Sequence, residues 1–249
     1  EKDIRDIVGD NKTDMKLSVM ADVGRTDYKK DILNKKDSVI DLIRVATYIN
    51  TIPAAIEMLE DAKRKGYETT VNIMAISTAK ESEITEALSL LSQCPVDVIY
   101  IVDSYGSMYM EQVDDLADKY LKMAEDHGKS VGMHAHNNQQ LAFANTIAAL
   151  TRGVSYLDST IGGMGRGAGN CSSEQLLGFL KNPKYDLIPI LQFLEKHIIP
   201  LKKSGVVWGY NIPYLLTGQT NQHPRSAIAA TKEKRTDFLN FLLELNDKD

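Results

Sequence analysis

Six short apolar segments recur along the chain, and segments with helical periodicity separate most of them. The apolar segments are rich in Val, Ile and Tyr, and they cover residues 16–22, 39–46, 69–77, 96–104, 129–136 and 154–160. Nearly continuous apolar segments of this length are typical of strands that are covered on both faces of a parallel sheet. Amphipathic segments lie between them, most clearly at residues 53–66, 81–93 and 111–128. The pattern predicts six strand–helix units in series.

The predicted helix ends agree with this series. Three helical segments close on a basic residue followed by glycine, and a predicted strand comes next; the pairs are Lys65-Gly66, His127-Gly128 and Arg152-Gly153. A cation in the last turn is stabilised by the helix dipole, and glycine readily takes the left-handed conformation that ends a helix. The expected fold is therefore α/β, with a parallel sheet covered by helices.

A regular parallel series forms either an open doubly wound sheet or a closed (β/α)8 barrel, and both bind ligands at the carboxyl ends of the strands. In this chain those ends carry several charged or polar side chains: Asp22, Arg44, Asp103 with Ser104, His134 with His136, and Asp158. Side chains of this kind at one end of so many strands favour a functional site there. Asp103 also has a simpler interpretation, because aspartate often caps the helix that follows a strand.

The two histidines are the most specific signal among these strand-end side chains. Side chains in a strand alternate between faces, so His134 and His136 point the same way. Two converging imidazoles are a common beginning of a metal site, although the pair alone also fits a solvated strand face.

A glycine-rich segment, residues 160–170, follows the sixth strand and precedes a helical segment. Its residues 163–168 match the loose form of the dinucleotide-binding fingerprint. We reject that interpretation because the fingerprint belongs to the first strand–helix turn of its fold, and five units precede this one. The backbone amides of this loop, at Gly165 and Gly167 among others, instead suit contact with an anionic substrate group.

Composition limits the remaining classes. The chain has 249 residues, 43% of them hydrophobic and 25% charged, with a formal net charge of −5. This balance offers no general electrostatic attraction to nucleic acid or anionic membranes, and no apolar segment reaches the length of a membrane span. The two cysteines, Cys94 and Cys171, form no CxxC motif, so we expect a cytoplasmic protein.

The segment "VGMHAHNNQQLAFANTIAALTRGVSYLDSTIGGMGRGAGN" resembles the signature of the pyruvate carboxyltransferase-like, or HMG-CoA lyase-like, metal-dependent aldolases and lyases. The resemblance extends from about residue 39 to residue 225 and is strongest to the 4-hydroxy-2-oxovalerate aldolase branch. It implies a (β/α)8 TIM barrel, here incomplete, in which the six predicted strands correspond to the family's third to eighth. Residues 1–249 would form one barrel domain, with residues 186–249 as a mostly helical C-terminal segment.

The same resemblance implies roles for individual residues. His134, His136 and Asn170 match positions that hold a divalent cation, Mn²⁺ or Mg²⁺, with Asn170 the weaker ligand. Asp103 and Ser104 match a pair beside the substrate, and Tyr214 matches a tyrosine assigned to proton transfer. We therefore expect Tyr214 and Asp103 to be catalytic and Ser104 to bind the substrate. We expect Arg44, Gly165 and Gly167 to contact the substrate. Cys171 does not match the reactive cysteine of the lyase branch, so we assign it no catalytic role.

The chain departs from the family at its beginning. The family's first strand carries an Arg-Asp pair, in which the aspartate is a third metal ligand and the arginine stabilises the enolate. Arg5-Asp6 lies in a segment that is predicted to be helical, and no other part of the chain matches the family's Arg-Asp pair. We therefore expect the first two strands of the family to be missing. Two neutral imidazoles bind a hard cation less well than a site with a carboxylate, so we expect this chain alone to be much less active.

The implied reaction is the cleavage of a 4-hydroxy-2-oxo acid to pyruvate and an aldehyde. The implied enzyme is a lyase that acts on a small 2-oxo acid and can assemble as a homo-oligomer. Two alternatives stay open. An acyl-CoA-dependent Claisen-condensing synthase of the isopropylmalate or citramalate type also uses a histidine pair of this spacing. A non-catalytic remnant of the barrel would explain the missing first strand.

Overall fold

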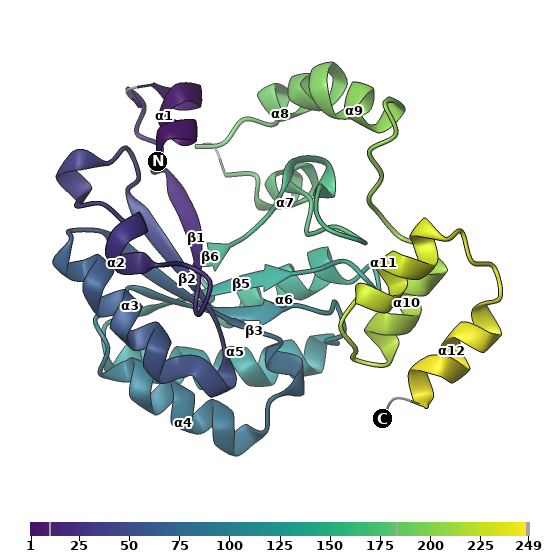
Figure 1. The fold of residues 1–249 in the computed structure, drawn as a ribbon, viewed down its shortest axis with the longest axis horizontal. Helices are drawn as coiled ribbons and strands as arrows, with labels where there is room; N and C mark the ends of the chain where they lie inside the picture. The colour runs from purple at the N-terminus through teal and green to yellow at the C-terminus, as the bar shows by residue number, and fades with distance from the viewer. Residues whose placement is uncertain (10, 183, 248–249) are drawn as a thin grey trace. The chain divides into compact units, whose positions relative to one another are not determined.

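The computed structural model describes residues 1–9, 11–182 and 184–247. Six strands form one sheet in the order β1-β2-β3-β4-β5-β6 (Figure 1). They are β1 Ser18–Asp22, β2 Leu42–Tyr48, β3 Glu68–Met74, β4 Val98–Asp103, β5 Ser130–Ala135 and β6 Tyr156–Leu157. The pairs from β1 to β4 run parallel, in a register that sets Met20 opposite Arg44. A parallel series in sequence order, predicted from the apolar segments, is confirmed.

The chain divides into two compact units, each made of two stretches of sequence. The first unit holds residues 1–102 and 118–132, and the second holds residues 103–117 and 133–249. The assignment of residues 1–249 to a single domain stays a prediction.

The first unit is built on strands β1 to β4, with helix α1 Lys2–Val8 before the first strand. The helices between the strands are α2 Tyr28–Asp31, α3 Ile52–Arg64 and α4 Glu81–Ser92. All six residues of β4 are buried, and so are five of the seven in β3, which explains their continuous apolar sequence. Helix α3 contacts β2 and β3 through Ala55, Met58, Leu59 and Ala62, which repeat at helical spacing on its buried side.

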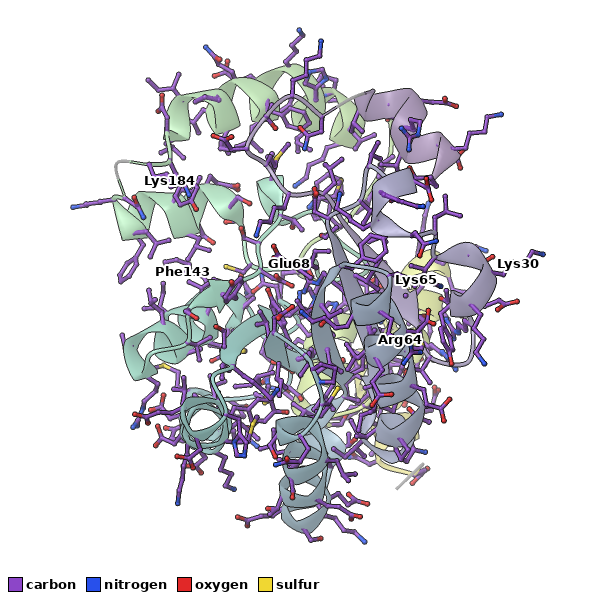
Figure 2. The ribbon with its side chains drawn as sticks, turned by 90° about the vertical axis from the view of Figure 1, so that its left-hand side faces the viewer. Lys30, Arg64, Lys65, Glu68, Phe143 and Lys184 are labelled. Atoms are coloured by element: carbon purple, nitrogen blue, oxygen red, sulfur yellow. The ribbon has the colours of Figure 1, made fainter. Side chains whose placement is uncertain are left out.

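The predicted helix ends are confirmed where glycine follows a basic residue. Gly66, Gly128 and Gly153 all have positive φ, from 62° to 113°. Figure 2 shows Arg64 and Lys65 where α3 ends, and the Lys65 ammonium lies 2.7 Å from the Asp61 carboxylate one turn earlier. A cation near the exposed carbonyl groups stabilises this end of the helix.

The first connection of the sheet differs from the regular series. Between β1 and β2 the chain forms only the four residues of α2 and a 3-10 turn, Lys35–Asp37, and no full crossover helix. The prediction of six complete strand–helix units was therefore wrong for the first unit of the series. The physical reason lies in residues 23–38, which are mostly polar and lack a stripe of apolar side chains that a longer helix would bury.

The second unit is mostly helical. Helix α5, Met110–Asp126, begins in this unit, and α6 Ala142–Arg152 and α7 Ser173–Leu180 follow. The C-terminal elements are α8 Leu187–Phe193, a π-helical turn Leu194–Ile198, α9 Ile199–Lys203, α10 Ile212–Gln219, α11 Arg225–Lys232 and α12 Phe238–Asn246. Buried side chains of α10, α11 and α12 pack together with Ala168 of the glycine-rich loop. No helix in the described part of the chain is long and apolar enough to cross a membrane.

Candidate functional site

The histidine pair lies at the carboxyl end of β5, in the second unit. His134 is in the strand and His136 follows it directly, so the two side chains lie on one side of the backbone. Their ring centroids are 4.9 Å apart, and the ring planes meet at 83°. The convergence that the two-residue spacing predicts is therefore present.

The Nδ1 atom of each ring is held by an oxygen atom. His134 Nδ1 lies 3.0 Å from Asp158 Oδ2, and His136 Nδ1 lies 3.0 Å from the backbone carbonyl oxygen of Asp103. The carbonyl oxygen can only accept, so His136 Nδ1 must carry the proton, and a hydrogen bond to the Asp158 carboxylate likewise needs a proton on His134 Nδ1. When such a ring is neutral, its Nε2 keeps a lone pair. This is the arrangement in which protein histidines bind metal ions.

The local environment keeps His136 neutral. Removal of the ring from water and the neighbouring His134 together lower the pKa of His136 to about 4, although the hydrogen bond to Asp103 opposes the shift. A neutral imidazole at physiological pH is the form that donates an electron pair to a cation. His136 is therefore in its ligating state without any further change.

Asn170 is joined to the histidine segment and carries an amide oxygen in its side chain. An isolated antiparallel β-bridge pairs Asn170 with His136. The side-chain nitrogen Nδ2 donates to the carbonyl oxygen of Met164 at 3.0 Å, which fixes the orientation of the amide. Its oxygen Oδ1 is buried and has no hydrogen-bond partner. A buried acceptor without a partner is rare in a folded protein and usually indicates an unfilled interaction.

The glycines of the loop make room for this arrangement. A Cβ atom added to Gly165 would collide with the Asn170 amide, and one added to Gly167 would lie 3.0 Å from the ring of Tyr214. Both glycines were predicted to contact substrate, and that role stays a prediction. Their observed contacts show that each lets a neighbouring side chain approach the loop backbone closely.

Asp103 holds the turn that follows β4. It is 1% exposed, and its carboxylate accepts hydrogen bonds from the backbone N–H groups of Ser107 at 3.0 Å and Met108 at 3.2 Å. Burial raises the pKa of this carboxyl to about 6, against the lowering effect of those hydrogen bonds. The geometry favours the capping interpretation over direct catalysis, because the carboxylate points at the chain's own backbone. Ser104 follows it and is half-buried.

Tyr214 lies in α10 with 7% of its surface exposed. Its backbone N–H donates to Asn211 Oδ1, which caps the helix at 2.9 Å, and Asn138 Nδ2 donates to its carbonyl oxygen at 3.3 Å. The ring packs in the same cluster as Ala168 and faces Gly167. Helix α10 thus places Tyr214 against the loop that carries Asn170.

Arg44 and Asp22 belong to the first unit. The Arg44 guanidinium lies over the ring of Tyr100, with its central carbon 4.5 Å from the ring centroid. Asp22 ends β1 and lies 3.5 Å from Arg25. The role of Arg44 in substrate binding therefore stays a prediction.

Two side chains of the site were not assigned a role from the sequence. Asp158 was placed at a strand end, but its contact with His134 joins residues 24 positions apart. Arg166 lies in the glycine-rich loop and is exposed. The only signal in the sequence was a charged side chain in a loop otherwise made of small and apolar residues.

The donor set fits a divalent cation in part. The rings of His134 and His136 are in contact, and a backbone bridge joins Asn170 to His136. Their roles as cation ligands stay predictions. No group of three or more His, Cys, Asp or Glu side chains that could hold a metal ion occurs in the described ranges 1–9, 11–182 and 184–247. The site therefore offers two imidazoles and one amide oxygen, and the expected carboxylate ligand is not with them.

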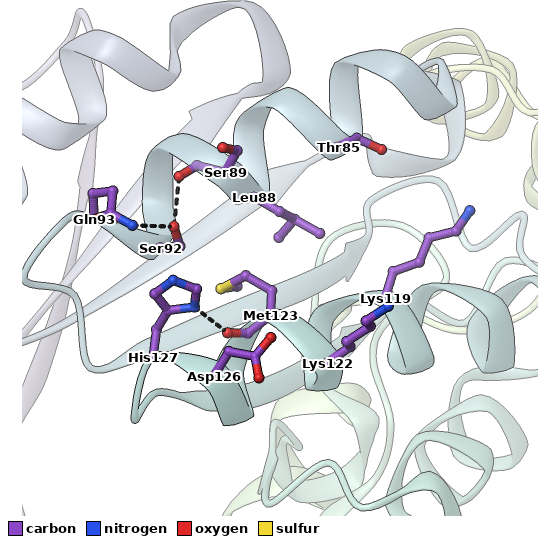
Figure 3. Close-up of a pocket in the computed structure, with 10 residues that line it drawn as sticks. All are labelled: Thr85, Leu88, Ser89, Ser92, Gln93, Lys119, Lys122, Met123, Asp126 and His127. Atoms are coloured by element: carbon purple, nitrogen blue, oxygen red, sulfur yellow. Dashed lines mark hydrogen bonds between the residues drawn. The ribbon is translucent and has the colours of Figure 1, made fainter.

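A separate groove lies in the first unit between α4 and α5 (Figure 3). It measures about 470 Å³ and is lined by side chains such as Leu88, Lys119 and Met123. His127 at its end uses Nδ1 in a 2.8 Å contact with the carbonyl oxygen of Met123 in the preceding turn. The groove has no converging set of donors like that around His136, so we do not regard it as the site.

Residues 45–192, which extend from within β2 through β6 and the glycine-rich loop, match the HMGL-like family. The parallel sheet with its strands in sequence order defines the class as an α/β protein. The family match then makes the assignment particular: the chain belongs to the HMGL-like family.

Curated relatives are named 4-hydroxy-2-oxovalerate aldolase. The relative from Pelotomaculum thermopropionicum is 36% identical over 181 residues, which cover 69% of this chain and 52% of the relative. The relative from Thermus thermophilus is 33% identical over 228 residues, covering 87% of this chain and 63% of the relative. The chain thus spans between half and two thirds of the length of these relatives.

Solved structures agree on the fold. The N-terminal domain of a candidate aldolase from Bacteroides vulgatus superimposes with a TM-score of 0.74 and 28% identity, covering 92% of this chain and 75% of that chain. The HMG-CoA lyase of Bacillus subtilis has a TM-score of 0.61 at 16% identity, covering 75% and 70%. The six-stranded sheet is therefore part of the TIM-barrel architecture of these proteins, as predicted.

Proposed function

We propose that the protein is a metal-dependent aldolase that cleaves a 4-hydroxy-2-oxo acid to pyruvate and an aldehyde. The observation that carries the proposal is the pair of imidazoles with both Nδ1 atoms held, next to the buried and unpartnered Oδ1 of Asn170. Membership of the HMGL-like family and the names of the curated relatives support the substrate class.

His134, His136 and Asn170 would hold the cation, Mn²⁺ or Mg²⁺. The cation would supply Lewis-acid polarisation of the substrate's keto group. Asp158 and the Asp103 carbonyl group keep the two imidazoles in the ligating tautomer, and the Asp103 carboxylate stabilises the turn from which that carbonyl group projects. Asp103 is therefore proposed as a positioning residue.

In the retro-aldol step, the 4-hydroxyl group loses its proton and the C3–C4 bond breaks. The electron pair of that bond passes to the pyruvate fragment as its enolate, and the aldehyde is released. A proton then returns to C3 to give pyruvate. We propose Tyr214 for proton transfer, because α10 places its ring beside Gly167 in the loop that carries Asn170. Arg44, Ser104, Gly165 and Gly167 remain proposed substrate contacts.

We also propose that the protein acts in the cytoplasm on a small-molecule substrate. Both cysteines are free and buried, which is compatible with a reducing compartment.

Metal binding and pyruvate production test the proposal together. After incubation with Mn²⁺ and dialysis, His134→Ala combined with His136→Ala should abolish retained metal. Asp158→Asn should weaken metal affinity by about 10- to 100-fold, because it releases the Nδ1 proton of His134 from its acceptor. Asp114→Asn, which removes the partner of Arg152 in a surface ion pair, is the matched control.

Pyruvate release is followed by coupling to lactate dehydrogenase, on the full-length protein, with and without Mn²⁺. Equal metal content in the wild type and the double variant would rule out the assigned ligands. Consumption of acetyl-CoA with a 2-oxo acid, in place of pyruvate release, would identify a Claisen-condensing synthase. A protein that does neither would be the non-catalytic remnant.

A further inference from the structure

Arg166 is an exposed cation in the glycine-rich loop of the second unit. No carboxylate in the described part of the chain forms an ion pair with its guanidinium group. The nearby acidic groups of the site are already engaged: Asp158 binds His134, and Asp103 binds the backbone of the turn at residues 107–108. An arginine placed among small residues, with no acid to neutralise it, is available to an external anion.

The loop holds Arg166 close to the histidine pair. The backbone N–H of Asn137 donates to Gly169 at 2.9 Å, and the N–H of Gly169 donates to Arg166 at 3.2 Å, so the loop is tied to the residue after His136. The proximity also appears in the electrostatics. After burial and His134, the charge of Arg166 contributes to the lowered pKa of His136. After burial, it is the next cause of the lowered pKa of His223.

His223 adds a neutral donor on the side of the α10–α11 connection. Its Nδ1 atom accepts a hydrogen bond from the backbone N–H of Arg225 at 3.1 Å, so the proton of the neutral ring must be on Nε2. The ring lies edge-on to Tyr105, with centroids 5.7 Å apart. Tyr105 is two residues from Asp103, whose carbonyl group binds His136. The glycine-rich loop thus carries a guanidinium cation, and the α10–α11 connection carries an imidazole N–H that is close enough to feel its charge.

We infer that Arg166, assisted by His223, binds an anionic group on the aldehyde half of the substrate. This inference rests on the proposed aldolase function and narrows its substrate class to 4-hydroxy-2-oxo acids that end in a carboxylate or a phosphate. The carboxylate of the pyruvate half belongs with the metal-binding side chains, so Arg166 recognises a second anion at the other end of the substrate.

The reaction in the direction of synthesis tests the preference. Pyruvate is combined with acetaldehyde, glyoxylate or D-glyceraldehyde 3-phosphate, which present a neutral, a carboxylate and a phosphate aldehyde. We expect the wild type to prefer one of the two anionic aldehydes, and the better of them identifies the anion. Arg166→Ala should lower kcat/KM for that aldehyde by roughly 10- to 100-fold and for acetaldehyde by less than about threefold. Arg166→Lys should retain part of the preference.

Lys203→Ala is the matched control, because it removes a positive charge from α9 of the same unit without touching the loop. A wild type that prefers acetaldehyde, or an Arg166→Ala variant that slows all three aldehydes equally, would overturn the inference and leave the aldolase function standing.

Fluorescence provides a readout that does not depend on turnover. Trp208 is the only tryptophan, and its indole N–H donates to the Gly162 carbonyl oxygen at 3.0 Å, so it reports on the glycine-rich loop. Titration with glyoxylate and with inorganic phosphate should change the emission of the wild type, with at least about tenfold weaker binding to Arg166→Ala. Equal binding of both anions to the two proteins would refute the Arg166 site even if no aldolase activity were found. If no aldehyde couples to pyruvate but the anions bind through Arg166, the proposed reaction fails and the anion site stands.

Discussion

At the scale of single residues, Asp103 and His136 are linked by one backbone carbonyl group but titrate in opposite senses. The Asp103 carbonyl oxygen holds His136, and the carboxylate of the same residue holds the next turn. Burial raises the pKa of Asp103 to about 6 and lowers that of His136 to about 4. Each shift favours the neutral form, which agrees with a site partly withdrawn from water.

The sign of each contribution to stability follows from these pKa values. Between about pH 4 and pH 6 folded Asp103 binds more protons than unfolded Asp103, so its contribution to stability falls as pH rises through this window. For His136 the unfolded state binds more protons between about pH 4 and pH 6.5, so its contribution rises with pH. The two contributions oppose each other, so this pair alone should make the stability of the wild type change little with pH between about 4 and 6.

Asp103→Asn should reveal the pH-dependent contribution of Asp103 to stability. The variant keeps one acceptor oxygen where the carboxylate has two, but it also removes the buried charge. Relative to wild type, its free energy of unfolding should increase from pH 4 to pH 7 by on the order of 1–3 kcal/mol. Urea unfolding at several pH values measures this difference, with Asp114→Asn as the surface control. A difference that is constant across the range would show that Asp103 does not titrate there.

At the scale of elements, the glycine-rich loop depends on backbone conformations that other residues avoid. Gly169 has a φ of +84°, and a Cβ atom added to it would collide with the carbonyl oxygen of Gly163. That carbonyl oxygen accepts from the backbone N–H of Asn170, so the collision would disturb the proposed ligand directly. Gly178 lies in α7, where an added Cβ atom would meet nothing within 4 Å.

We therefore expect opposite results from two Gly→Ala substitutions. Gly169→Ala should destabilise the protein by about 1–3 kcal/mol and weaken Mn²⁺ retention, because it forces a strained backbone against a fixed carbonyl group. Gly178→Ala should stabilise by about 0.5–1 kcal/mol through helix propensity, with no effect on metal. Thermal unfolding and metal analysis of both variants decide the matter. Equal effects would mean that the loop is not conformationally constrained.

At the scale of the whole molecule, the sheet begins with a strand that has one partner. β1 is first in the strand order and pairs with β2, and no strand in the described part of the chain pairs with its other edge. Met20 in the middle of β1 is 53% exposed. An edge strand with an exposed apolar side chain favours pairing with a further strand, whether from the same protein or from another copy.

Met20→Lys should reduce such association, because a charged side chain on an edge strand opposes pairing with a second copy. Light scattering during size-exclusion chromatography of this chain should show a lower mass at a given concentration than for the wild type. Met110→Lys, at the exposed start of α5, changes the same residue type away from a strand edge and is the control. An unchanged mass for Met20→Lys would show that this edge makes no contact between copies.

Much of this molecule follows from local sequence alone. The apolar segments predict the six strands because a parallel strand that is covered on both faces has apolar residues at nearly every position. Glycine after a basic residue predicts the helix ends because only local backbone conformation is involved. The spacing of His134 and His136 determines that they share a face, since alternation in a strand is a local property. The short connection after β1 was not predicted. A polar segment indicates that no apolar face is buried there, but it does not specify which local structure forms.

Tertiary structure decided what the histidines contact. Asp158 and the Asp103 carbonyl group hold the two rings from positions 24 and 33 residues away, and no local pattern specifies such pairs. The same holds for Asn170, whose bridge to His136 and unpartnered oxygen depend on how the glycine-rich loop folds back. Sequence specifies which chemical groups are available at the strand ends. Packing between segments that are distant along the chain sets the orientation and protonation of these groups. It also decides which of their polar atoms are left without a hydrogen-bond partner.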